Sequence, residues 1–113
     1  MHRIFTTSVA AVYPAYVAKL ARKSRTEAEL REVICWLTGF DDAELQHHLD
    51  TNTTFETFFA SSTLNPMASA ITGSICGVRI EEIDDPLMKA IRYLDKLVDE
   101  LAKGRPMSRV LRS

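Results

Sequence analysis

The segment from Asp85 to Gly104 constrains the fold of this chain more than any other part of the sequence. Its apolar residues recur at alternating spacings of four and three residues, at Leu87, Ile91, Leu94, Val98 and Leu101. This spacing is typical of an amphipathic helix. Because Asp85-Pro86 is a favourable helix start and Gly104 a favourable stop, the pattern predicts one long helix over 86–103. The rest of the chain must fold against its apolar stripe.

The composition is that of an ordinary globular domain. With 113 residues, of which 46% are hydrophobic and 26% charged, the chain is expected to form a single helical domain over 1–113. Its net charge is −1, from 14 basic and 15 acidic residues. This balance favours neither nucleic acid, nor an anionic membrane surface, nor an acidic partner.

Two cysteines, Cys35 and Cys76, lie far apart in apolar stretches and form no CxxC motif. Free cysteines usually pack as small apolar residues, and a disulfide framework in a short chain would need more of them. We therefore expect a reducing, cytoplasmic location. No apolar run approaches the ~20 residues of a membrane-spanning helix, so no association with a membrane is expected.

Capping residues predict several further helices. The expected ranges are 9–23, 27–38, 42–49, 55–60 and a short turn at 107–111. The second of these starts with a capping box, Thr26-Glu27-Ala28-Glu29, and ends at Gly39. Asp41 and Thr54 are the expected caps of the next two. The first is expected to place Tyr13, Tyr16, Val17 and Leu20 on one face.

The segment 67–83 is ambiguous between a helix and a strand. Its β-branched residues favour a strand, but a strand needs a partner, and the only other β-like run is 3–7. We therefore favour a helix, in which Gly73 and Gly77 would admit a neighbouring helix. The predicted fold is all-α, a compact bundle of about five or six helices with a long C-terminal helix. The alternative is an α+β fold with a small two-stranded ribbon from 3–7 and 75–81.

A set of short motifs spread over nearly the whole chain resembles a known family. The motifs are Tyr13-Pro14, Arg25-Thr26, Trp36-Leu37-Thr38-Gly39, Phe58-Phe59, Asn65-Pro66, Ile71-Thr72-Gly73, Cys76-Gly77-Val78-Arg79, Asp85-Pro86-Leu87-Met88 and Ile91-Arg92-Tyr93-Leu94-Asp95-Lys96-Leu97. In combination they are similar to the domain of unknown function 2200 family of small bacterial proteins. This chain departs from the family pattern at Phe40 and Ser24, where the family has tyrosine and glycine. The resemblance implies a bacterial, cytoplasmic, single-domain protein and implies no activity, cofactor or catalytic residue.

Three charged residues are the strongest candidates for a ligand site. Arg79 follows the glycine-containing Cys76-Gly77 pair, and Arg92 and Asp95 lie three residues apart on the long helix, where they can pair. An arginine fork suits a carboxylate or phosphate ligand. Trp36 and Tyr93 could line the same pocket. The alternative interpretation is that all five residues serve structure, as ion pairs between helices and as core aromatics.

No residue pattern predicts a metal or a cofactor. His47 and His48 are adjacent, so on a helix they point about 100° apart and cannot hold one ion together. The acidic residues at 81–85 do not follow the spacing of a calcium loop, and Asp85 is needed as a cap. We expect no metal site, no cofactor and no catalytic constellation of known type.

Nucleic-acid binding is not favoured, although the helices at 27–38 and 42–49 are joined as in a helix-turn-helix. The would-be recognition helix carries Asp41, Asp42, Glu44 and Asp50, which a phosphate backbone would repel.

The sequence therefore favours a small, non-catalytic, cytoplasmic binding or protein-interaction domain. The alternative is an enzyme or small-ligand binder with a cleft around Arg79, Arg92 and Asp95. The near-3.5-residue repeat of the long helix adds the hypothesis of a homodimer through that helix.

Overall fold

The computed structural model describes residues 2–112. The helices are α1 (Val9–Ala21), α2 (Glu27–Thr38), α3 (Asp42–Asp50), α4 (Phe55–Ser61), α5 (Pro86–Ala102) and α6 (Met107–Val110). Three short 3-10 helices, η1 (Arg3–Thr6), η2 (Pro66–Ala70) and η3 (Ile80–Glu82), and a two-stranded ribbon of β1 (Ser74–Ile75) and β2 (Val78–Arg79) complete the chain. The predicted, mainly helical fold is confirmed, with a small ribbon added.

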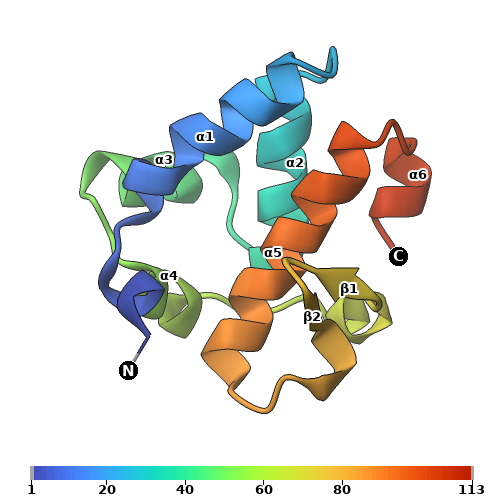
Figure 1. Ribbon diagram of the computed structural model, residues 1–113. Helices are drawn as coiled ribbons and strands as arrows, with labels where there is room; N and C mark the ends of the chain where they lie inside the picture. Colours follow the sequence, from blue (N-terminus) through green and yellow to red (C-terminus); the bar gives the residue numbers. More distant parts are fainter. Residues whose placement is uncertain (1, 113) are drawn as a thin grey trace.

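Helix α5 runs through the middle of the molecule, and the other elements surround it (Figure 1). It contacts α1, α2, α4, α6, η3 and β1. Its apolar stripe is buried from Ala90 to Leu101. The Asp85 carboxylate accepts the backbone N–H groups of Leu87 and Met88, both at 2.9 Å, and so caps the first turn. The sequence prediction of a capped central helix is confirmed.

The N-terminal segment is held by backbone bonds to the loop between α3 and α4. Val9 N–H donates to the Thr53 carbonyl at 2.9 Å, and Phe55 N–H donates to the Thr7 carbonyl at 3.0 Å. These bonds place η1 beside α4 and near the first half of α5 (Figure 1). In this position η1, together with α1 and α5, lines a cavity.

The interpretation of 67–83 as a helix is wrong, and so is the ribbon between 3–7 and 75–81. Residues 3–6 form η1, and the ribbon pairs within the segment itself, with Ser74 opposite Arg79 and Ile75 opposite Val78. Cys76 and Gly77 form the turn, with φ values of 53° and 77°. Positive φ at both central residues is the geometry of a tight hairpin turn. The segment thus supplies its own strand partner.

Cys76 is the strained residue of this turn, because a side chain with φ of 53° is unfavourable outside Gly, Asn and Asp. We expect Cys76→Asn to raise the free energy of unfolding by about 0.5–1 kcal/mol, since Asn-Gly is the preferred pair in such turns. Urea denaturation measures the change. Cys76→Val is the matched control and should destabilise the protein, because a β-branched residue tolerates positive φ poorly. Stability that is equal in the two variants would contradict the assignment of strain.

Ser24 also has a positive φ, of 60°, in the turn between α1 and α2. A glycine would adopt this backbone conformation at lower cost.

An aromatic cluster surrounds His48 at the end of α3. The ring centroids of Phe40 and Phe58 lie 4.7 Å and 5.3 Å from that of His48. His48 Nδ1 lies 3.0 Å from Thr53 Oγ1. Burial lowers the pKa of His48, and the neighbouring His47 lowers it further. The folded protein therefore binds this proton more weakly than the unfolded chain does.

The free energy of unfolding should consequently fall as the pH is lowered below about 7. Above the unfolded pKa of about 6.5 the ring is neutral in both states, and the contribution of His48 is fully present. Below it the unfolded chain gains the proton first, and stability is lost until the lower folded pKa is reached. Urea denaturation between about pH 7.5 and 5 measures the slope. His48→Asn should flatten the slope, and a slope equal to that of the wild type would refute this assignment.

Candidate functional site

The five candidate residues do not form one cluster. Arg79 lies on β2 with its side chain 63% exposed, and it pairs with Glu81 at 3.5 Å. Trp36 is half-buried against the core on α2, and its indole Nε1 is buried without a partner among residues 2–112. Tyr93 is buried in the core. Of the five, Arg92 and Asp95 share a cavity, so the cleft predicted around Arg79, Arg92 and Asp95 forms only in part.

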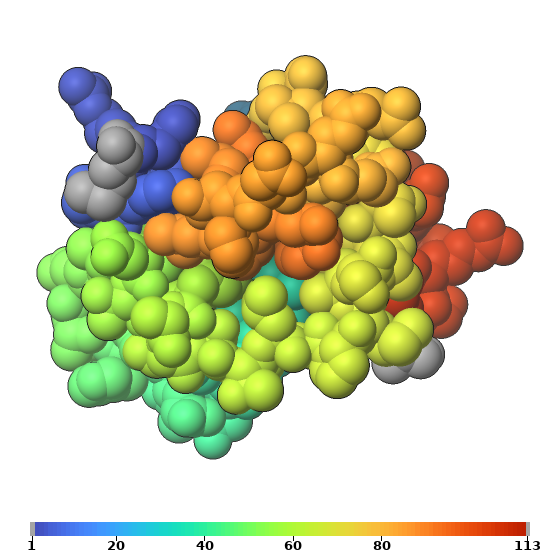
Figure 2. All heavy atoms as spheres, turned by 90° about the horizontal axis from the view of Figure 1, so that it is seen from below, coloured from blue at the N-terminus to red at the C-terminus, as the bar shows by residue number. Residues whose placement is uncertain are grey.

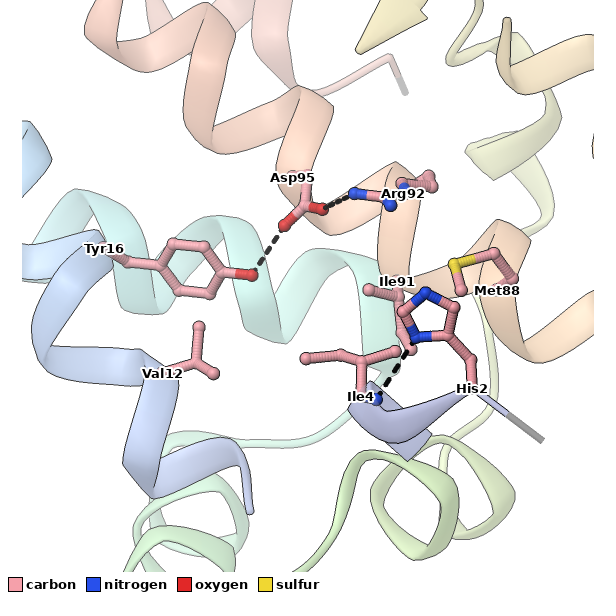
Figure 3. Close-up of a pocket in the computed structure, with 8 residues that line it drawn as sticks. All are labelled: His2, Ile4, Val12, Tyr16, Met88, Ile91, Arg92 and Asp95. Atoms are coloured by element: carbon pink, nitrogen blue, oxygen red, sulfur yellow. Dashed lines mark hydrogen bonds and ion pairs between the residues drawn. The ribbon is translucent and has the colours of Figure 1, made fainter. Parts of the chain in front are cut away.

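The cavity that Arg92 and Asp95 share lies between η1, α1 and α5 and has a volume of about 200 Å³ (Figure 3). Its apolar wall is formed by Ile4, Val12, Met88 and Ile91. Its polar lining is formed by His2, Tyr16, Arg92 and Asp95. An apolar cavity with a few converging polar groups is the usual form of a small-molecule site.

A hydrogen-bonded chain of three side chains forms the polar end of the cavity. The Tyr16 hydroxyl reaches across from α1 and donates to Asp95 Oδ1 at 2.7 Å, as Figure 3 shows. Arg92 Nη1 donates to Asp95 Oδ2 at 3.0 Å from one turn earlier on α5. The carboxylate thus joins α1 to α5 and fixes the positions of both neighbours. The Arg92 Nε–H group is buried and has no acceptor among the residues that the structure describes.

Tyr16 does not act as a general base near neutral pH. Burial raises the pKa of its hydroxyl far above the usual value, and the negative charge of Asp95 and the hydrogen bond to it raise this pKa further. The hydroxyl therefore stays protonated. Its role is to hold Asp95 in place.

His2 brings a fourth polar group to the cavity from the N-terminal side. Its Nδ1 accepts the backbone N–H of Ile4 at 3.3 Å and so caps η1. A neutral ring whose Nδ1 is an acceptor carries its hydrogen on Nε2. In Figure 3 the ring lies next to Met88.

Sequence reasoning missed His2 and Tyr16. Tyr16 was placed correctly on the packed face of the first helix, and a buried tyrosine generally needs a partner for its hydroxyl. That rule calls for a polar partner, but Asp95 is 79 positions away in the sequence, so only the fold identifies it. For His2 the sequence offers no such signal.

Two other hollows have less specific linings. One, of about 260 Å³, lies between α4 and the start of α5, where Figure 2 shows a depression between the green-yellow and orange segments. Its lining is apolar except for Glu56. The other is an open depression that contains Cys35, Arg31 and Asp42. Burial raises the pKa of the Cys35 thiol, so this cysteine is not an activated nucleophile.

The acidic segment 81–85 is used structurally. Glu81 Oε1 accepts the Gly73 N–H at 2.9 Å, and Asp85 caps α5. Within residues 2–112 no group of three or more His, Cys, Asp or Glu side chains is placed to hold a metal ion. Over the same residues, no helix combines the length and the apolar character needed to cross a membrane.

Comparisons with other proteins identify relatives but no activity. A family model described as "Uncharacterized protein conserved in bacteria (DUF2200)" matches residues 3–112. A solved structure, "Crystal structure of uncharacterized protein SP1917", is similar at 47% sequence identity and a TM-score of 0.91, over 98% of this chain and 93% of that one. A search of curated proteins gives no match. Neither description names a ligand, so any function must be argued from the geometry.

Proposed function

Since the chain belongs to the DUF2200 family of uncharacterized bacterial proteins, as its sequence motifs predicted, we propose from its geometry that it binds a small organic molecule, without catalysis, in the cavity between η1, α1 and α5. The observation that carries this proposal is the asymmetry of the cavity. One wall is apolar, and at the other end Arg92 and Asp95 meet Tyr16 in a fixed arrangement. Such a lining can bind the apolar body of a ligand and orient its polar group.

The chemistry of the lining supports binding over catalysis. Among the described residues that line the cavity there is no serine, threonine or cysteine to act as a nucleophile. Tyr16 is held protonated by the raised pKa of its hydroxyl, and both Asp95 oxygens accept hydrogen bonds from neighbouring side chains. Because each Asp95 oxygen is already bonded to a neighbouring side chain, the geometry favours a positioning role for this carboxylate over that of a general base.

Titration of isotope-labelled protein with ring-sized molecules tests this proposal. Toluene, benzyl alcohol, benzamide and benzoate are suitable probes, because an engineered cavity of about 150 Å³ is known to bind benzene. At least one probe should shift the amide resonances of residues that line the cavity, such as Val12 and Ile91.

Two variants of α1 show where the probe binds. Val12→Phe should fill the cavity and abolish the shifts, whereas Ala11→Phe, on the exposed side of the same helix, should leave them intact. If no probe produces saturable shifts at these residues, or if Val12→Phe leaves binding unchanged, the proposed function is wrong.

We also propose a cytoplasmic location and retain the homodimer as a hypothesis. Both cysteines are free, Cys35 half-buried and Cys76 exposed, as suits a reducing compartment. A dimer through α5 would have to use another face of the helix, because its apolar stripe is covered within the chain. Light scattering across a dilution series decides the matter, and a monomer mass at every concentration would reject the dimer.

A further inference from the structure

We propose that the cavity takes a small monocarboxylate with an apolar body, recognised by Arg92 and His2. This inference rests on the proposed function, and it adds the chemical class of the ligand. It follows from which hydrogen-bonding groups of the lining are already used within the protein and which are not.

The acceptor at the polar end is largely occupied. Asp95 Oδ1 accepts from Tyr16, and Asp95 Oδ2 accepts from Arg92. Tyr16 donates its single hydroxyl hydrogen to Asp95 Oδ1 and has no other hydrogen to donate. A ligand with only donor groups would therefore compete with two short bonds that already exist.

The donors, in contrast, are largely unused. Arg92 has five N–H bonds, of which the structure pairs one from Nη1 within residues 2–112. Its Nε atom is buried beyond the reach of a ligand, whereas Nη2 has no acceptor among these residues and remains available to one. His2 uses Nδ1 as an acceptor towards Ile4, so the single N–H donor of its neutral ring is at Nε2. A ligand with hydrogen-bond acceptors would pair with these unused donors.

A carboxylate fits this excess better than a neutral acceptor does. A carboxylate oxygen accepts a charge-assisted bond from Arg92 Nη2, which is stronger than a bond between neutral groups. Because Asp95 holds Nη1, the guanidinium group stays oriented while Nη2 binds. The nearby Asp95 charge weakens the attraction for an anion, and the unpaired Arg92 Nη2 and the His2 Nε2–H offset it.

The apolar wall limits the size and the polarity of the part of the ligand that lies beyond the carboxylate. Ile4, Val12, Met88 and Ile91 offer only hydrocarbon and thioether contacts. About 200 Å³ accommodates one ring or a short branched chain in addition to the carboxylate. The expected class is thus aryl carboxylates and short branched-chain carboxylates.

Four matched probes test the ligand class, followed by amide resonances of the full chain: benzoate, benzamide, toluene and benzylamine. Benzoate should bind at least about tenfold more tightly than benzamide and toluene, since a charge-assisted pair is about twice as strong as a neutral bond. Arg92→Gln and His2→Asn should each weaken benzoate and leave toluene unchanged. His2→Asn keeps an acceptor that can cap η1 and removes the Nε2 donor. Arg79→Gln, on the exposed ribbon, is the control and should change nothing.

Each other outcome overturns the carboxylate assignment in a distinct way. If toluene or benzamide binds as tightly as benzoate, the cavity binds small molecules but does not select a carboxylate. If benzylamine binds most tightly, Asp95 rather than Arg92 is the recognising group. If benzoate shifts only resonances outside the cavity, or if no probe reaches the cavity, the inference fails, and in the latter case the proposed function fails with it.

Discussion

Arg112→Met is expected to lower the free energy of unfolding by about 3–5 kcal/mol, because it leaves a buried carboxylate without its partner. Glu100 lies on α5 with 2% of its surface exposed. Arg112 donates to both of its oxygens, from Nη1 at 2.6 Å and from Nη2 at 2.7 Å. This two-pronged pair holds the segment after α6 against the end of α5. Urea denaturation followed by circular dichroism measures the loss.

A neighbouring arginine provides the control for this prediction. Arg105 lies 3.8 Å from the same carboxylate, but its side chain is 54% exposed. Arg105→Met should cost less than about 1 kcal/mol, as exposed ion pairs generally do. A similar loss in both variants would show that Glu100 is stabilised by charge alone and not by the geometry of Arg112.

A double variant separates the cost of an unpaired charge from the value of the pair. Replacing a buried ion pair by apolar residues of similar size is often neutral or stabilising. Glu100→Leu combined with Arg112→Met should therefore recover most of the stability that Arg112→Met alone loses. If the double variant is as unstable as the single one, the packing of the Arg112 stem matters more than its charge.

The helices were predictable from sequence because their signals are local. Thr26 and Glu29 make both bonds of the predicted capping box, and Asp41 with Glu44 forms a second one. The stripe of α5 repeats over its whole length and is buried as the period requires. Where capping residues and apolar periodicity agree, the sequence determines the position of the helix.

The ribbon could not be predicted for a physical reason. Each of its strands has two residues, too few to show the alternation that identifies a strand. The turn residues Cys76-Gly77 have positive φ, but cysteine is not a typical residue at such a position. The only other β-like run, 3–7, was therefore the expected partner, although the paired residues lie three and five positions apart within the segment itself.

The candidate site was predictable only where its residues share one helix. Arg92 and Asp95 were expected to pair because residues three apart on a helix are neighbours, and they do. The sequence could not show that Tyr16 bonds to the same carboxylate or that η1 closes the cavity. Both facts depend on contacts between segments far apart in the chain.

Phe58→Ala should lower the free energy of unfolding by about 3–5 kcal/mol, the usual cost of removing a buried aromatic ring. Phe58 is fully buried. Its ring packs edge-on against Phe40 and Phe59, with centroid distances of 5.1 Å and 5.2 Å. Such pairs add to the energy of burial. Phe58→Leu keeps most of the volume and should cost clearly less, so it remains measurable even if Phe58→Ala does not fold.

The pH dependence gives this prediction a second, independent readout. The Phe58 ring helps to bury His48, and burial is the largest cause of the lowered pKa of that histidine. A smaller residue at position 58 should admit water to the imidazole and bring its folded pKa back towards about 6.5. The loss of stability below about pH 7 should then be shallower in Phe58→Leu than in the wild type. An unchanged slope together with a large loss of stability would mean that Phe58 supports the core but does not shield His48.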